Sequence, residues 1–170
     1  MVIGATGSGK STLARRLSNK LGLKHIELDK LLFDKELERV SDTTFRKRVV
    51  SLSKKESWVC DGIFYNIADL LWPKADLILW VGAPLITIYR RVLLRSIYRI
   101  ITRKTKPGGQ RETFRTAFGK DGIVRVVPHI YSNVQREYPK LISELNLENK
   151  VIKMKSKKDI NNFLEKLSET

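Results

Sequence analysis

The chain has 170 residues, of which 42% are hydrophobic, and its 33 lysines and arginines against 18 aspartates and glutamates give a net charge of +15. This length fits one domain with one substantial core, and no apolar run approaches the roughly 20 residues of a membrane-spanning helix. Because no signal peptide is visible and Cys60 is the only cysteine, we expect a cytoplasmic protein without internal disulfides and without a membrane partner.

The first half of the chain alternates short apolar strands with helical patterns. In chain order, it predicts a strand at residues 1–3, a helix at 11–21 that ends at Gly22, a strand at 25–29, a helix capped by Ser41 or Asp42, and a strand at 58–62. A strand, a helix and a strand in succession indicate a parallel unit.

The second half continues the alternation. The apolar run at 76–82 predicts a strand covered by helices on both faces, and a long helix begins at Leu85. Residues 102–111 form a polar, basic loop. Residues 121–145 have a helical pattern that prolines 128 and 139 should kink or divide. A last strand at 150–155, a loop at Ser156 and a helix at 158–167 complete the chain.

Between the first strand and the first helix lies the motif GATGSGKST, residues 4–12, which matches the phosphate-loop pattern GxxxxGK[ST]. Its glycines permit backbone angles that turn successive amides toward phosphate oxygens at a helix N-terminus. Lys10 supplies a cation to the outer phosphates, and Ser11 supplies a hydroxyl for Mg²⁺. The predicted nucleotide-binding residues in this loop are Gly4, Thr6, Gly7, Ser8, Gly9, Lys10, Ser11 and Thr12.

Together, motif and elements predict an α/β fold of the P-loop NTPase class. We expect a three-layer sandwich with about five parallel strands flanked by helices, forming a single domain over residues 1–170.

Two acidic residues end predicted strands, where ligands gather in parallel sheets. Asp61 and Ser11 are the candidate residues of a Mg²⁺ site, in which Asp61 would hold a water molecule bound to the metal. Asp61 and Gly62 are also candidate substrate-binding residues. Asp29 is suited to accept a hydrogen bond or a proton from an acceptor substrate. For both acids, an ordinary turn or capping role is the alternative interpretation.

Arginines 91, 95 and 99 recur at every fourth position of the long predicted helix and so share one stripe. Such guanidinium groups can stabilise the charge of a transferring phosphoryl group, and the alternative is an ordinary basic outer face. The wider segment 86–125 holds 11 basic and two acidic residues. It should attract polyanions, either nucleotide phosphates or nonspecifically a nucleic-acid backbone, unless it is merely solvated. In this segment, Gly108 and Gly109 are candidate hinges, and a passive turn is the alternative interpretation.

The ordered set of segments resembles the adenylate-kinase-like branch of small P-loop kinases, and most closely the group named DNA topology modulation protein, or FlaR-like. The resemblance rests on GSGKSTLARRLSNKLGL, HIELDKLLF, WVCDG, ADLILWVGAP and VIKMKSKKDINNFLEKL. It implies a sheet that binds ATP, an acceptor-side region at about 30–57, and a basic helical lid at about 90–125. Arg91 and Arg95 would lie at the base of this lid as catalytic residues with Lys10 and Asp29. Ser156 and Lys157 would pass over adenine.

Three departures from related motifs limit the choice of substrate. Asp61-Gly62 is followed by Ile-Phe-Tyr where adenylate kinases have Phe-Pro-Arg, which disfavours adenosine monophosphate as acceptor. Glu27-Leu28-Asp29 replaces the Asp-x-Asp of shikimate kinases, which disfavours shikimate. The Asn-Lys-x-Asp motif of GTPases is absent.

The leading hypothesis is a Mg²⁺-dependent kinase that uses ATP to phosphorylate a nucleotide, a nucleoside or another small acceptor. Arg99 joins Asp29, Asp61 and Gly62 as a candidate for binding that acceptor. The alternatives are a nucleic-acid-binding regulator of DNA topology switched by ATP, and a simple ATPase, although no helix-turn-helix, zinc or RNA-binding signature is visible. The sequence predicts neither the acceptor nor the oligomeric state.

Overall fold

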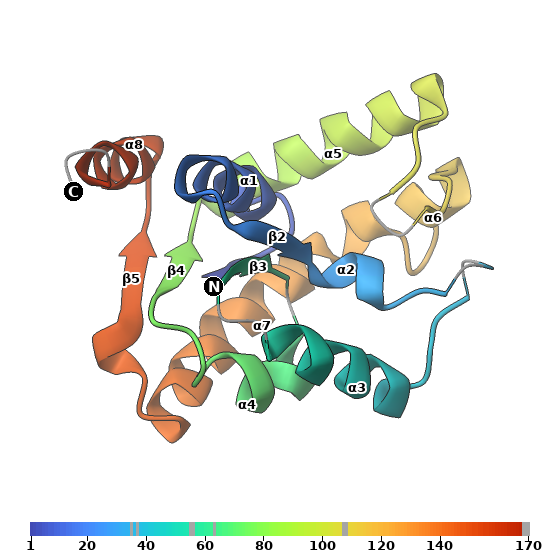
Figure 1. Ribbon diagram of the computed structural model, residues 1–170. Helices are drawn as coiled ribbons and strands as arrows, with labels where there is room; N and C mark the ends of the chain where they lie inside the picture. Colours follow the sequence, from blue (N-terminus) through green and yellow to red (C-terminus); the bar gives the residue numbers. More distant parts are fainter. Residues whose placement is uncertain (35, 37, 55–56, 63, 107–108, 168–170) are drawn as a thin grey trace.

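The computed structural model describes residues 1–34, 36, 38–54, 57–62, 64–106 and 109–167 (Figure 1). The strands are β1 (Val2–Ile3), β2 (Lys24–Glu27), β3 (Trp58–Asp61), β4 (Ile78–Val81) and β5 (Val151–Met154). The helices are α1 (Lys10–Leu21), α2 (Leu28–Leu31), α3 (Asp42–Ser53), α4 (Ala68–Leu71), α5 (Leu85–Thr102), α6 (Phe114–Phe118), α7 (Ile123–Glu144) and α8 (Lys157–Lys166). Two short 3-10 turns lie at Tyr65–Ile67 and Glu148–Lys150.

The five strands form one parallel sheet in the order β2-β3-β1-β4-β5, which confirms the predicted α/β fold. The central strand β1 has only two residues, and Val2 lies opposite both Asp61 of β3 and Leu79 of β4. The chain that leaves β1 therefore emerges beside the carboxyl ends of its two neighbours. The phosphate-loop motif begins at this point.

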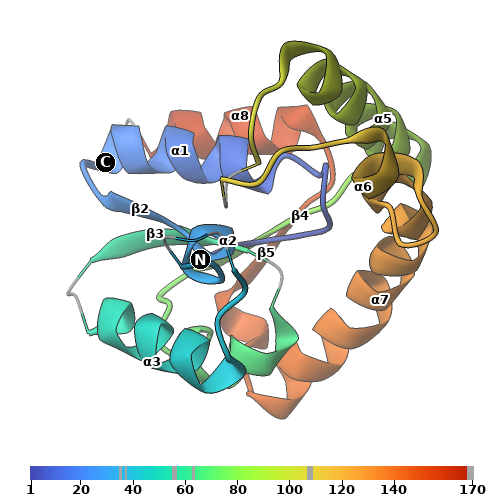
Figure 2. The same cartoon turned by 90° about the vertical axis from the view of Figure 1, so that its right-hand side faces the viewer.

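Helices cover both faces of the sheet, with α1 and α8 on one face and α3 and α7 on the other (Figure 2). The pleat of each strand sends alternate side chains to opposite faces. Val59 and Leu79 accordingly pack with α1 and α8, whereas Cys60 and Trp80 belong to the other core. Cys60 is 1% exposed, and its burial raises the pKa of its thiol to about 12, as expected for a structural cysteine.

Asp29 does not end a strand as predicted, because β2 stops at Glu27 and Asp29 lies in the first turn of α2. The packing of Leu28 explains this difference. A Cβ on Gly62 would lie 2.8 Å from the Leu28 side chain, so this buried leucine occupies the space that the glycine leaves. The chain leaves the sheet two residues earlier than its apolar pattern predicts, and α2 begins with Leu28 seated in the core.

Helix α7 runs without division through Pro128 and Pro139, although a division was one predicted outcome. The two prolines are three turns apart and both are exposed, so they lie on the solvent side of the helix. Water can satisfy the carbonyl groups that each proline ring leaves without a donor. On the buried side of the helix, Tyr138 meets Trp72 and Trp80 in edge-on ring contacts and fixes α7 to the sheet.

None of the helices in the described part of the chain is long and apolar enough to cross a membrane. Helix α5, which has 18 residues, buries Ile88 and Val92, and Gly7 of the phosphate loop lies beside these two residues.

Gly4 is the glycine on which the entry into the phosphate loop depends. It has φ +147°, and a Cβ at this position would collide with the Val81 carbonyl oxygen. We expect Gly4→Ala to lower the free energy of unfolding by roughly 3 kcal/mol or more, because backbone rather than a flexible side chain must move. Urea denaturation measures the effect. Gly22→Ala is the control, since φ is +66° there but space is open, and it should cost only about 1 kcal/mol. Equal losses would contradict this account.

Candidate functional site

The phosphate loop joins the end of β1 to the start of α1, and arginines of α5 brace it from outside. Gly9 caps α1 with φ +107°. Arg91 Nη1 donates to the carbonyl oxygens of Gly7 and Ser8, at 3.3 and 3.1 Å, and Arg95 Nη2 donates to Thr6 Oγ1 at 3.2 Å. Two of the three arginines in the basic stripe of α5 therefore contact the loop directly.

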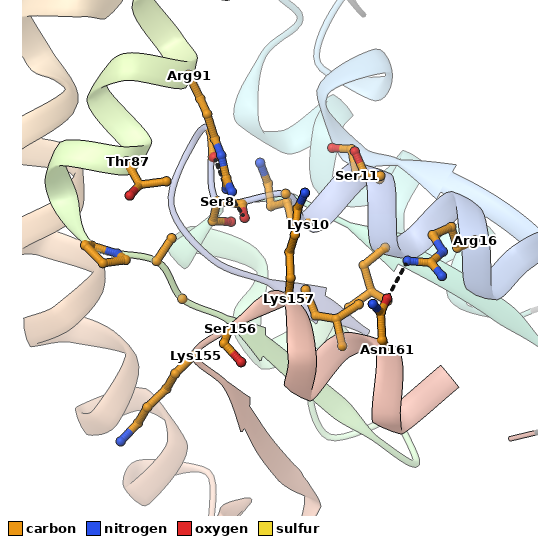
Figure 3. Close-up of a pocket in the computed structure, with 18 of the residues that line it drawn as sticks. Ser8, Lys10, Ser11, Arg16, Thr87, Arg91, Lys155, Ser156, Lys157 and Asn161 are labelled. Carbon is orange, nitrogen blue, oxygen red and sulfur yellow. Dashed lines mark hydrogen bonds between the residues drawn. The ribbon is translucent and has the colours of Figure 1, made fainter. Parts of the chain in front are cut away.

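A cavity of about 730 Å³ opens beside this loop, and we call it the phosphate-loop cavity (Figure 3). Its lining comprises Gly7, Ser8, Gly9, Lys10, Ser11, Thr12, Leu13, Arg16, Gly82, Ala83, Pro84, Thr87, Arg91, Arg95, Lys155, Ser156, Lys157, Ile160 and Asn161. Arg16 Nη1 donates to Asn161 Oδ1 at 3.3 Å and so links α1 to α8. Ser156, the predicted adenine-side residue, caps α8 by accepting from the Asp159 backbone amide. The cavity thus extends from the loop to the start of α8.

A second cavity, of about 600 Å³, lies on the other side of Lys10, and we call it the Asp29 cavity. It is lined by Thr6, Lys10, Ser11, Arg15, Glu27, Asp29, Leu32, Phe33, Phe64, Tyr65, Arg95, Arg99, Lys106, Gln110, Glu112, Ile123, Ile130 and Asn133. This lining combines aromatic and aliphatic side chains with both acids and cations. Lys10, Ser11 and Arg95 line both cavities, so the two spaces meet at these three residues.

Lys10 and Asp29 influence each other's charge where the cavities meet. Lys10 is 8% exposed, and this burial lowers the pKa of its ammonium group, an effect opposed by the carboxylates of Asp29 and Asp61. The Asp29 carboxylate opens onto its cavity, yet desolvation by the surrounding protein raises its pKa, and Lys10 opposes this shift. A carboxylate with a raised pKa is a better proton acceptor than an ordinary aspartate. Arg95 also has a lowered pKa because of burial, but a guanidinium remains charged.

Asp61 lies behind Ser11 and is held by a residue that sequence reasoning missed. Ser11 Oγ donates to Asp61 Oδ2, and His25 Nε2 lies 2.8 Å from Asp61 Oδ1. Both carboxylate oxygens of this 3% exposed residue therefore have partners. The sequence held one sign of this contact, the polar His25 near the amino end of the second predicted strand. In the structure, the parallel pairing of β2 with β3 places residues 25–27 beside residues 59–61.

Glu112 is the second residue that sequence reasoning missed. It is 6% exposed, accepts from Ser96 Oγ at 2.7 Å and from Arg99 Nη1 at 3.4 Å, and so ties the segment before α6 to α5. Arg99 is therefore engaged by Glu112, unlike the two arginines that contact the loop. Glu112 was visible only as one of two acids within a strongly basic segment.

Three predicted site residues line neither cavity among the described residues: Gly4, Asp61 and Gly62. Gly4 shapes the start of the loop, Asp61 accepts a hydrogen bond from Ser11, and Gly62 packs under Leu28. Of the predicted hinge glycines, Gly109 has φ +86°, and Gly108 lies outside the described residues.

The comparisons with known proteins point to shikimate kinases. The family model described as shikimate kinase matches residues 6–57. A shikimate kinase of Sulfurihydrogenibium sp. is 28% identical over 106 residues, which cover 54% of this chain and 64% of that relative's length. The structure of shikimate kinase from Bacteroides thetaiotaomicron superposes with a TM-score of 0.59 at 15% identity, over 99% of this chain and 94% of that one.

These findings show a shared fold and a partial sequence similarity. The chain has the α/β fold of shikimate kinase over nearly its whole length, and its sequence similarity to that family includes most of the phosphate loop. They support a shikimate-kinase-like P-loop protein, and they do not extend to the FlaR-like group that the sequence analysis placed first.

His25 should matter for the metal that accompanies a bound nucleotide, since it fixes the carboxylate that orients Ser11. We expect His25→Ala to weaken Mg²⁺ affinity in the nucleotide-bound protein roughly tenfold, as for other groups that orient a metal ligand. Mg²⁺ titration of a bound fluorescent ATP analogue measures this.

His129→Ala is the matched control, because it removes the only other histidine, an exposed residue of α7. Equal Mg²⁺ affinities of the two variants would remove His25 from the site.

Proposed function

We propose that this protein is a Mg²⁺-dependent kinase that transfers a phosphoryl group from ATP to a small acceptor. The observation that carries the proposal is the meeting of the two cavities at Lys10, Ser11 and Arg95. A nucleotide in the phosphate-loop cavity and an acceptor in the Asp29 cavity would have the transferring group between them, beside two cations. Phosphoryl transfer depends mainly on such positioning and on stabilising charge.

The residues have distinct roles in this proposal. Lys10 and Arg95 stabilise the charge that spreads over the phosphoryl oxygens, and Arg91 braces the loop through its carbonyl groups. Asp29 orients the acceptor hydroxyl and takes its proton, aided by its raised pKa.

The metal site is also part of the proposal. The described residues include no cluster of three histidine, cysteine, aspartate or glutamate side chains. This fits Mg²⁺, which is usually held by few protein groups together with phosphates and water. Ser11 would hold the ion, with Asp61 acting through the serine hydroxyl. When bound, Mg²⁺ offsets phosphate charge during transfer.

The acceptor is a small hydroxyl compound, and shikimate is the first candidate to test. The family match over residues 6–57 supports it, because this stretch contains both Asp29 and the acceptor-side region. Glu27 stands where shikimate kinases have the first aspartate of their Asp-x-Asp motif, and here it pairs with Lys30 at 2.8 Å. This departure favours a related hydroxyl acid or a sugar as the alternative acceptor.

A regulator of DNA topology, as in the FlaR-like group, is the second candidate function. Only the excess of nine positive charges in residues 86–125 favours it. Two of these positive charges, on Arg91 and Arg95, lie at the phosphate loop. The binding of nucleotide phosphates would explain them without a nucleic acid.

The test is incubation with Mg·ATP and a panel of shikimate, related hydroxyl acids, sugars, nucleosides and monophosphates, followed by mass spectrometry. We expect one compound class to gain a single phosphoryl group in step with ADP release. If ADP forms at a rate that is independent of every acceptor, or that depends on DNA, the protein is an ATPase and the kinase proposal is wrong.

Two substitutions separate binding from chemistry. Lys10→Ala should abolish ATP turnover without unfolding the protein. Asp29→Asn should leave the ATP dissociation constant within about twofold but reduce transfer to the acceptor at least a hundredfold, since general-base contributions are roughly 10²–10⁴. Equilibrium binding and single-turnover kinetics distinguish the two effects. Normal transfer by Asp29→Asn would remove the role assigned to this carboxylate.

A further inference from the structure

Helix α5 carries an exposed apolar side next to the arginines that contact the phosphate loop. Figure 1 shows this yellow-green helix along the upper edge of the molecule, with its C-terminal end projecting beyond the sheet. Its exposed apolar residues, with their exposed fractions, are Ile86 (75%), Leu94 (54%), Ile97 (40%), Tyr98 (51%) and Ile101 (75%). At 3.6 residues per turn, these positions and Arg90 fall within an arc of about 120°. We call these six residues the outer α5 face.

Cations lie within this apolar surface and at its C-terminal end. Arg90 lies within it, and the exposed Arg103 and Lys104 follow at the end of the helix. Lys104 Nζ lies 2.8 Å from the Tyr98 hydroxyl and 5.0 Å from the centre of its ring. Phe114, 71% exposed, begins α6 just after the segment that Ser96 and Arg99 hold against α5. An apolar strip bordered by positive charge is the combination that binds at an anionic lipid interface.

We propose that the outer α5 face docks the protein, reversibly and without spanning, on an anionic phospholipid surface. Arg90, Arg103 and Lys104 supply the attraction, and aliphatic side chains supply the burial that holds the helix in the headgroup region. This inference goes beyond the proposed kinase. It also revises the sequence-based expectation of no membrane partner, which rested on the absence of a spanning segment.

The chemistry of the surface favours lipid over two other occupants. Nucleic-acid surfaces use aromatic side chains that stack on bases, whereas the outer α5 face presents mainly isoleucine and leucine. A second copy of the chain would bring Arg90, Arg103 and Lys104 of both copies together, and the like charges would repel. An anionic bilayer satisfies the apolar and the cationic groups at once.

Docking by this face does not require the arginines of α5 to leave the phosphate loop. At 3.6 residues per turn, Arg91 and Arg95 lie about 20° and 60° beyond the Tyr98 edge of the outer α5 face, where they contact the phosphate loop. Thr87 falls within the arc of the outer α5 face and Arg91 lies at its edge, and both also line the phosphate-loop cavity, so the bilayer would lie next to the proposed nucleotide site. ATP turnover without vesicles therefore tests the kinase proposal independently of docking.

The experiment is co-sedimentation of the full chain with vesicles of phosphatidylcholine alone, or of phosphatidylcholine and phosphatidylglycerol in equal parts. We expect binding to the anionic vesicles only, with weakening as salt rises. The double variant Ile86→Asp and Ile101→Asp should bind at least about tenfold more weakly, because it removes the two most exposed anchors.

The matched control is Leu21→Asp with Ile152→Asp, which changes the net charge equally at aliphatic residues 45% and 41% exposed on other elements. It should stay within about threefold of the wild type, and circular dichroism checks that both variants fold. A second variant, Ile101→Trp, keeps an apolar anchor and should show a blue shift of fluorescence with anionic vesicles.

Several results would overturn the proposal. Equal losses of vesicle binding in the two double variants would show that net charge alone, and not the outer α5 face, determines binding. Equal binding to neutral vesicles, or no blue shift of the added tryptophan, would exclude docking by this face. Duplex DNA binding that depends on Ile86 and Ile101 would assign the face to nucleic acid. A dimer in light scattering that the Ile86→Asp and Ile101→Asp variant dissociates would assign it to a second copy.

Discussion

The fold depends on one constraint, the passage of the backbone from a two-residue central strand into α1 through a loop that only glycine can form at key positions. Gly4 presses against the Val81 carbonyl, and a Cβ on Gly7 would lie 2.8 Å from the Val92 side chain of α5. The loop is therefore wedged between β4 and α5. Arg91 and Arg95 then fasten its polar groups to the same helix. A rigid, cationic turn results at the carboxyl edge of the sheet.

This rigid turn separates two spaces and joins them at Lys10. The side of the loop facing α8 has the room and the backbone groups for a nucleotide, whereas the side facing α2 presents Asp29 with aromatic residues. Because Lys10 is buried between them, its charge reaches both. The proposed function follows from this arrangement more than from any single motif, since the phosphate loop alone fits ATPases and kinases equally. The outer α5 face lies on the same bracing helix, adjacent to Arg91.

Much of the fold and the donor half of the site could be predicted from the sequence, because these parts have local signatures. Apolar runs marked the strands, and GxxxxGK[ST] marked the loop. The packing of Leu28 on Gly62, which moves Asp29 from a strand to α2, depends on residues distant in sequence. The same is true of the His25 and Glu112 contacts. The acceptor could not be predicted because its cavity is assembled from side chains of many separate segments.

The central claim is that a phosphoryl group passes between the two cavities at Lys10 and Arg95. The most direct test is a crystal structure with ADP, Mg²⁺, aluminium fluoride and the acceptor found by the panel. The account predicts ADP in the phosphate-loop cavity, the fluoride group in contact with Lys10 and Arg95, and the acceptor hydroxyl in line with it beside Asp29. A nucleotide bound elsewhere, or a fluoride group facing only water with the acceptor outside the Asp29 cavity, would contradict it.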